Sequence, residues 1–177
     1  GSKQRSDPGR REKVKQKVAL LLLPEFLPSE VERHFAMMPE RYLRITDPDQ
    51  IAQQLRLVRQ LDSQSLVTAW KVGTDRHFTE LTVCTRDSAG LFARIAGTLT
   101  ASGLNILSAD LNTREDGVVI DTFRVSEVGG HQPVKSDRWP RIETNLKDAI
   151  EGRLEVADEV ERWRAKVRRP RRRNTRP

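Results

Sequence analysis

A short polar turn, Asp87–Gly90, carries the clearest chemical signal in this sequence, because it lies where a β-prone run passes into an amphipathic segment. The first N–H groups of a helix have no intrahelical partner and attract an anion or a carboxylate. A glycine at position 90 lets a ligand approach the backbone closely. We therefore predict a small-molecule site that includes Asp87, Ser88, Ala89, Gly90, Leu91 and Phe92.

The next β-prone run begins with two further candidates, Asn105 and Ile106. The amide side chain of Asn105 can hydrogen-bond an amino or amide group of a ligand. Taken singly, polar residues of this kind are more typical of a turn or a helix cap. The ligand-binding prediction therefore depends on the combination of the turn with Asn105 and Ile106.

The histidines give no sign of a catalytic centre or a metal site. His34 lies in a predicted helix, His77 before a predicted strand and His131 in a loop, so we expect the three to be isolated. We predict no catalytic residue, no metal ligand and no cofactor in this segment.

The remaining reactive side chains have structural explanations. Asp110, Asp116 and Asp121 fall on two paired strands and their turn, where the polarity of a hairpin accounts for them. Cys84 is the only cysteine, which excludes an intramolecular disulfide. We expect its side chain to be buried or half-buried in a strand rather than to act as a nucleophile.

The elements that must position the turn form an α+β pattern. Strands are predicted at Leu66–Val72, His77–Thr85, Leu104–Thr113 and Val118–Glu127, with a turn at Gly73–Arg76, and helices follow Gly90 and surround Ile142–Ile150. From the second strand onward the order is β-α-β-β-α, a ferredoxin-like βαββαβ unit without its last strand. Either that strand is missing, or Leu66–Val72 fills an edge position in its place.

Short helices are predicted on both sides of this module. Helical spacing begins near Lys13, Ser29 opens a capping box, and Asp47-Pro48 is a third start signal. Apolar residues spaced four, three and four apart predict a further helix over Val156–Val167. The expected organisation is a tag remnant and disordered basic segment (1–12), a helical linker (13–65), the α+β domain (66–153), and a helix with an arginine-rich tail (154–177).

Charge and hydropathy bound the function classes. The formal net charge is +7, yet the basic residues gather at the two ends, with six arginines between Arg168 and Arg176. Charge on terminal segments is typical of solvated linkers, so we expect no specific nucleic-acid partner. No apolar run is long enough to span a bilayer, and we expect a cytoplasmic protein without membrane contact.

Three segments, Thr85–Gly97, Gly103–Asp110 and Asp121–Val125, resemble the ACT domain, a family of amino-acid-sensing βαββαβ modules. Within that family, Gly90–Ala96 and Asp121–Phe123 are similar to the first ACT domain of the bifunctional PII uridylyltransferase/uridylyl-removing enzymes of bacterial nitrogen control. The family usually has Arg-Pro-Gly where this chain has Ser88-Ala89-Gly90, which implies a less rigid ligand loop.

The resemblance implies a regulatory module that senses glutamine. The parent enzyme would transfer UMP to the PII signalling protein and remove it again, with Mg or Mn in its catalytic domains. None of those catalytic motifs occurs in this sequence. Self-association of ACT domains is a further implication.

Two other functions fit the same pattern. A ferredoxin-like sheet can bind RNA by presenting exposed aromatic side chains, for which Phe78 and Phe123 are the candidates. A ligand-free oligomerisation module is the second alternative, because an unpaired sheet edge promotes association.

Overall fold

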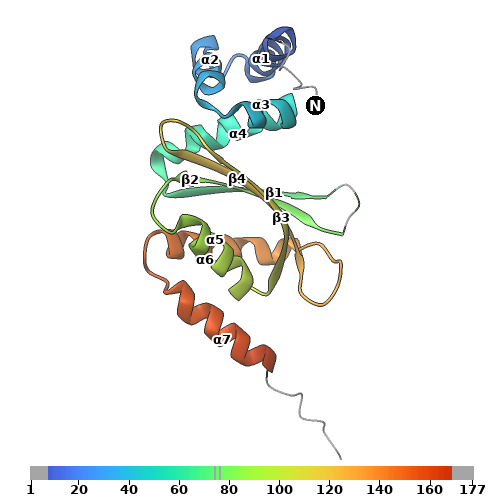
Figure 1. Ribbon diagram of the computed structural model, residues 1–177, viewed down its shortest axis with the longest axis vertical. Coiled ribbons are helices and arrows are strands. Elements are labelled where there is room, and N and C mark those ends of the chain that lie inside the picture. The colour runs from blue at the N-terminus through green and yellow to red at the C-terminus, as the bar shows by residue number, and fades with distance from the viewer. Residues whose placement is uncertain (1–7, 74, 76, 169–177) are drawn as a thin grey trace, which may run out of the picture. The chain divides into compact units, whose positions relative to one another are not determined.

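The computed structural model describes residues 8–73, 75 and 77–168. It contains a four-stranded antiparallel sheet in the order β1-β2-β4-β3, formed by β1 (Leu66–Val72), β2 (Thr79–Arg86), β3 (Leu104–Thr113) and β4 (Val118–Glu127) (Figure 1). The expected α+β ferredoxin-like class is confirmed. The expected tag remnant and the other residues before Pro8, the turn residues Thr74 and Arg76, and the tail beyond Arg168 lie outside the described residues.

Strand β1 takes the place of the final strand of a βαββαβ unit. In that unit the last strand pairs with the first at one edge of the sheet. Here β2 is the first strand of the module, and β1 lies beside it at the edge, joined by a hydrogen bond from Gly73 N to Phe78 O of 2.8 Å. Of the two alternatives left open by the sequence, the structure shows the one in which Leu66–Val72 fills the edge position.

The central and edge strands of the sheet differ in burial as their positions require. Most of β4 is buried on both faces, since it lies between β2 and β3. Strand β3 is an edge, and its Leu107 and Leu111 are each 49% exposed although they share the predicted apolar face. An exposed apolar edge of this kind is a surface for association with another molecule.

The chain divides by its internal contacts into two compact units. The first comprises the described residues of Gly1–Ala69 with Thr82–Asp87 and Ala109–Thr122. Its helices are α1 (Pro8–Leu22), α2 (Pro28–Met37), α3 (Glu40–Ile45) and α4 (Pro48–Gln60), followed by the short 3-10 helix η1 (Leu61–Ser63). Apolar residues of these helices form one core with Val67, Cys84, Val118 and Ile120 of the strands.

Three details of the first unit differ from the sequence predictions. Helix α1 begins at Pro8, so residues 8–12, which we expected to be disordered, are helical. The N-cap of α2 is Leu27 rather than Ser29, because Glu30 accepts a hydrogen bond from Leu27 N at 2.7 Å. Helix α3 was not predicted, since six residues after a proline show too little apolar periodicity.

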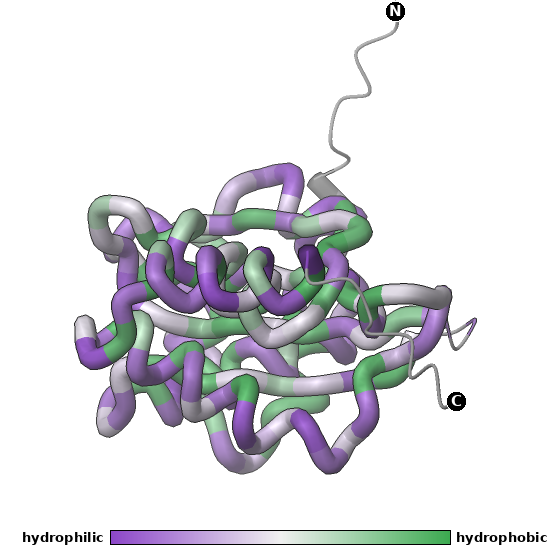
Figure 2. The backbone as a smooth tube through the Cα atoms, turned by 90° about the horizontal axis from the view of Figure 1, so that it is seen from below, coloured by the Kyte–Doolittle hydropathy of each residue, from purple (hydrophilic) through white to green (hydrophobic). Residues whose placement is uncertain are grey.

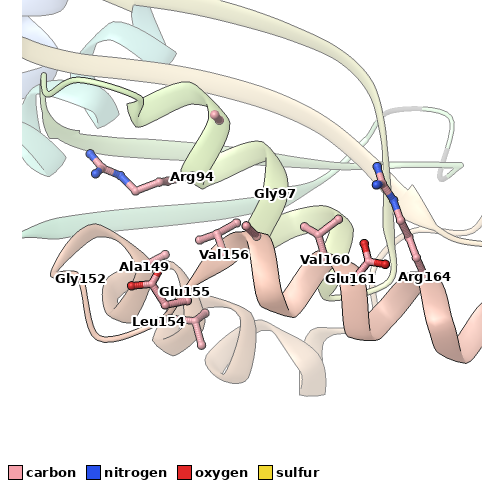
Figure 3. A pocket seen from close by; sticks show the side chains of 12 residues that line it. Arg94, Gly97, Ala149, Gly152, Leu154, Glu155, Val156, Val160, Glu161 and Arg164 are labelled. Atoms are coloured by element: carbon pink, nitrogen blue, oxygen red, sulfur yellow. The ribbon is translucent and has the colours of Figure 1, made fainter.

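The second unit comprises Trp70–Leu81, Ser88–Ser108 and the described residues of Phe123–Pro177. Helix α5 (Leu91–Ala101) packs against both α6 (Trp139–Ile150) and α7 (Val156–Arg168), while η2 (Ser136–Arg138) leads into α6. Val156 and Val160 of α7 point toward Gly97 of α5 (Figure 3). A Cβ atom at position 97 would lie 2.4 Å from Val156 Cγ1, so the absence of a side chain lets α7 approach α5.

Hydrophobic residues are distributed along the described chain rather than gathered in one long segment (Figure 2). Figure 2 shows hydrophilic and hydrophobic residues following one another at short intervals along the tube. Among the described helices, none is both long enough and apolar enough to cross a membrane.

Candidate functional site

The predicted turn leads directly into α5. Gly90 is the N-cap of this helix, with a left-handed φ of 72°, and Leu91 N donates to Ser88 O at 3.2 Å. A left-handed φ strains residues that carry a Cβ, which explains the glycine. Ser88, Ala89 and Gly90 are all exposed. The N-cap residue has no side chain, so it provides no side-chain acceptor for the first N–H groups of α5.

Asp87, the first residue of the turn, is held through its backbone. Its N–H donates to Gly117 O at 2.8 Å, in the turn between β3 and β4. The side chain of Asp87 is exposed. Asp87 therefore presents its carboxylate to solvent while its backbone position depends on the β3–β4 turn.

Arg94, which the sequence prediction omitted, contacts the same loop. Its Nη2 donates to Ser88 Oγ at 2.6 Å, while its Nε is buried without a hydrogen-bond partner in the described structure. The contact restrains Ser88. Its signal in the sequence is weak, because neither its residue type nor its spacing from Ser88 indicates this contact.

The two residues that follow the turn lie differently. Leu91 is buried, whereas Phe92 is half exposed and its ring stacks on that of Phe123 with centroids 6.4 Å apart. Of the two aromatic candidates for the RNA-binding alternative, Phe123 is fully buried and Phe78 is half-buried. The stacked pair packs α5 against β4 in the second unit.

Asn105 and Ile106 begin β3 as predicted. Asn105 is exposed and Ile106 is half-buried. Both follow the end of α5, a helix of 11 residues and so about 16 Å long, and the structure therefore does not bring them together with Gly90 at its start. Their part in ligand binding stays a prediction.

Asp121 is an unexpected buried carboxylate. It is only 5% exposed, and its Oδ1 accepts a hydrogen bond from Asn112 N at 3.1 Å. Burial raises the pKa of Asp121 to about 6, the Asn112 N–H opposes this rise, and the charge of Asp87 adds to it. Hairpin polarity does not explain a buried acid, so the expectation for Asp121 needs correction.

The histidines and the cysteine can now be placed. His34 is fully buried, and His77 and His131 are neighbours rather than isolated, with ring centroids 6.5 Å apart. Adjacent strands β2 and β4 bring the segments that carry them together. Within the described residues, no group of three or more His, Cys, Asp or Glu side chains could hold a metal ion. Cys84 is buried as expected, and burial raises its pKa to about 12.

A cavity of about 630 Å³ lies in the second unit along the seam of α5 and α7 (Figure 3). Its lining includes Arg94, Gly97, Ala149, Val156 and Val160, with Glu155 and Arg164. The space is largely apolar with charged side chains around it, and it begins one helical turn beyond Gly90.

Comparison with known proteins supports the fold assignment. Residues 79–136 match the family model of the ACT domain. This segment begins with β2, contains the turn, α5, β3 and β4, and ends at Ser136.

Three relatives of the chain are each named bifunctional uridylyltransferase/uridylyl-removing enzyme. The protein from Azospirillum brasilense is 29% identical over 160 residues, which cover 89% of this chain and 17% of the relative. Those from Rhodospirillum rubrum and Gluconobacter oxydans are 31% identical over 133 residues and 32% identical over 143 residues. They cover 74% and 79% of this chain, and 14% and 15% of the relatives.

This chain therefore spans roughly one sixth of the length of these relatives, and the matches extend well beyond the ACT segment. The chain carries an ACT domain at residues 79–136 and is homologous over most of its length to a segment of bifunctional uridylyltransferase/uridylyl-removing enzymes.

Proposed function

We propose that this chain is the glutamine-sensing regulatory module of a protein-PII uridylyltransferase/uridylyl-removing enzyme that controls nitrogen metabolism in the cytoplasm. The proposal rests mainly on the ACT domain at residues 79–136. It rests also on relatives of that enzyme name, whose alignment covers most of this chain. ACT domains are regulatory modules, and residues 79–136 of this chain match the family model.

The loop before α5 suits an amino acid ligand. Its α-carboxylate can accept hydrogen bonds from the N–H groups of the first turn, where the helix dipole favours negative charge. No heavy atom lies within 4 Å of a Cβ built on Gly90, so the backbone there is open to a ligand.

We propose that catalysis takes place in other domains of the parent enzyme. Its catalytic domains would hold Mg or Mn and act on the PII protein, and the module would bias them according to glutamine. The half-exposed Leu107 and Leu111 on edge strand β3 favour self-association of ACT domains as a second role.

Calorimetric titration of this chain with glutamine tests the proposal. We expect saturable heat with glutamine, and at least tenfold weaker binding after Gly90→Val, because the added side chain occupies the open space above the loop. Glutamate and asparagine serve as comparison ligands.

Gly129→Val is the matched control for backbone strain. Gly129 also has a positive φ, 95°, with nothing within 4 Å of an added Cβ, and it lies outside the predicted site. This variant should keep the affinity of the unsubstituted chain. Absence of heat with every common amino acid, or equal weakening by both substitutions, contradicts the proposal.

A further inference from the structure

The turn between β3 and β4, residues Arg114–Gly117, is hydrogen-bonded on one side to Asp87, the first residue of the proposed ligand loop Asp87–Gly90. Gly117 O accepts the N–H of Asp87 at 2.8 Å. The turn is closed by a hydrogen bond from Gly117 N to Arg114 O of 2.8 Å and by one from Arg114 N to Val118 O of 2.7 Å. A displacement of Asp87 therefore acts directly on a closed, hydrogen-bonded turn.

The same turn is bonded on its other side to α2. Glu115 N donates to Met37 O at 3.1 Å, and Arg114 Nη1 donates to His34 Nδ1 at 3.1 Å. The other edge of the Arg114 guanidinium donates two hydrogen bonds to Asp116, from Nε to Oδ1 at 2.8 Å and from Nη2 to Oδ2 at 2.7 Å. One planar side chain thus fixes the shape of the turn and joins it to a helix.

The tautomer of His34 follows from these contacts. An arginine can only donate, so Nδ1 of His34 is the acceptor and Nε2 carries the proton. Nε2 then donates to the Tyr42 hydroxyl at 3.3 Å, and that hydroxyl donates to Gln54 Oε1 at 2.5 Å. Burial, followed by the Arg114 charge, lowers the pKa of His34 to about 3, so the ring stays neutral.

These hydrogen bonds join one turn to three helices, since His34 lies in α2, Tyr42 in α3 and Gln54 in α4. All three side chains are buried, where a hydrogen-bond network has few alternative arrangements. The helices lie outside the segment that matches the ACT domain. The turn is therefore a direct connection from a residue of the ligand loop to the preceding helices.

We propose that Arg114 is a positioning residue whose contacts with His34 and Asp116 hold the β3–β4 turn, so that changes at Asp87 are transmitted to α2, α3 and α4. The identity of the ligand that would cause such changes depends on the proposed function. The positioning of Asp87 by Arg114 does not depend on it. Hydrogen-bond networks and rigid elements of this kind carry coupling when they shift as a unit.

Hydrogen exchange followed by mass spectrometry tests the proposal without any ligand. In Arg114→Met, amides of the peptide that contains Asp87 and of the peptides from α2 to α4 should exchange about tenfold faster, because charged hydrogen bonds are lost. Peptides from α5 and α6 should be unchanged. Arg114→Lys should recover only part of the protection, since an ammonium cannot reproduce the planar fork.

Arg56→Met is the matched control. Arg56 donates to Leu21 O at 3.2 Å on the surface of the helices, so its loss should leave the Asp87 peptide unchanged. Faster exchange at α2 to α4 with no change at Asp87, or a uniform increase that includes α6, overturns the proposal.

A glutamine arm separates this proposal from the glutamine assignment. In the unsubstituted chain, bound glutamine should slow exchange in α2 to α4, and Arg114→Met should abolish that effect while calorimetric binding persists. If glutamine produces no heat, the assigned function fails, and the ligand-free comparison still decides the role of Arg114. Persistent slowing in Arg114→Met contradicts the proposed transmission.

Discussion

Replacing Tyr42 by phenylalanine should lower the free energy of unfolding by about 2–4 kcal/mol, because each buried polar group left unpaired costs about 1–3 kcal/mol. The ring of Tyr42 is 1% exposed and would keep its packing. Its hydroxyl is the acceptor for His34 Nε2 and the donor to Gln54 Oε1. Without it, both partners remain buried and unpaired.

Urea unfolding of the two-residue variant Tyr42→Phe/Gln54→Leu distinguishes this cause from a general packing effect. Removing both partners of a buried hydrogen bond is nearly neutral compared with removing one. We therefore expect the second substitution to recover part of the loss. A loss below about 0.5 kcal/mol in Tyr42→Phe, or a further loss in the combined variant, would show that the hydroxyl is not a necessary part of the network.

Asp121→Asn should stabilise the chain near neutral pH by about 2–3 kcal/mol, with no gain near pH 3. The pKa of Asp121 is raised from 3.8 to about 6 in the folded state, and each pKa unit corresponds to about 1.4 kcal/mol. A raised acid pKa means that stability is highest where the carboxyl is protonated and falls as the pH rises through about 4–6. An asparagine keeps the oxygen that accepts from Asn112 N and avoids the buried charge.

Unfolding of both forms in urea at several pH values between 3 and 8 measures this difference. The depressed pKa of His34 acts in the opposite direction, since stability from a buried neutral histidine is lost as the pH falls below about 6.5. Only the difference between Asp121→Asn and the unsubstituted chain isolates Asp121. Asp62→Asn, at an exposed position, is the matched control. A difference that does not grow between pH 4 and 6 contradicts the burial argument.

The strands were the part of the fold that sequence pattern specified best. Leu66–Val72, Leu104–Thr113 and Val118–Glu127 have the predicted bounds, because alternation and flanking turn residues mark both ends. The same pattern left open whether Leu66–Val72 replaces the last strand of the βαββαβ unit or that strand is missing. The structure shows that Leu66–Val72 pairs with β2 at the edge of the sheet. Strand pairing depends on contacts between distant residues, which local periodicity does not predict.

The edge position of β1 has a consequence for the preceding helices. Because this strand comes before the ACT segment in the chain, η1 leads directly into the sheet. Thr85 Oγ1 donates to Ser65 O at 2.7 Å and Arg86 Nη2 donates to Leu61 O at 3.3 Å. These bonds fix the end of η1 and the start of β1 against β2.

The site could be predicted only where it is local in sequence. The turn from Asp87 to Leu91 is contiguous and was found from its residue types. The link between Arg114 and His34 joins residues 80 positions apart, and neither type marks such a contact by itself. The burial of Asp121 was missed for the same reason, since strand alternation does not show which strand becomes central.

Mapping of amide chemical shifts during titration with glutamine tests the central claim most directly. We expect the largest changes on Asp87 and on residues Ser88 to Phe92, and we expect them to saturate with the affinity seen by calorimetry. Saturating changes centred on α6 or α7, or no changes at all, would contradict a glutamine site at the N-terminus of α5.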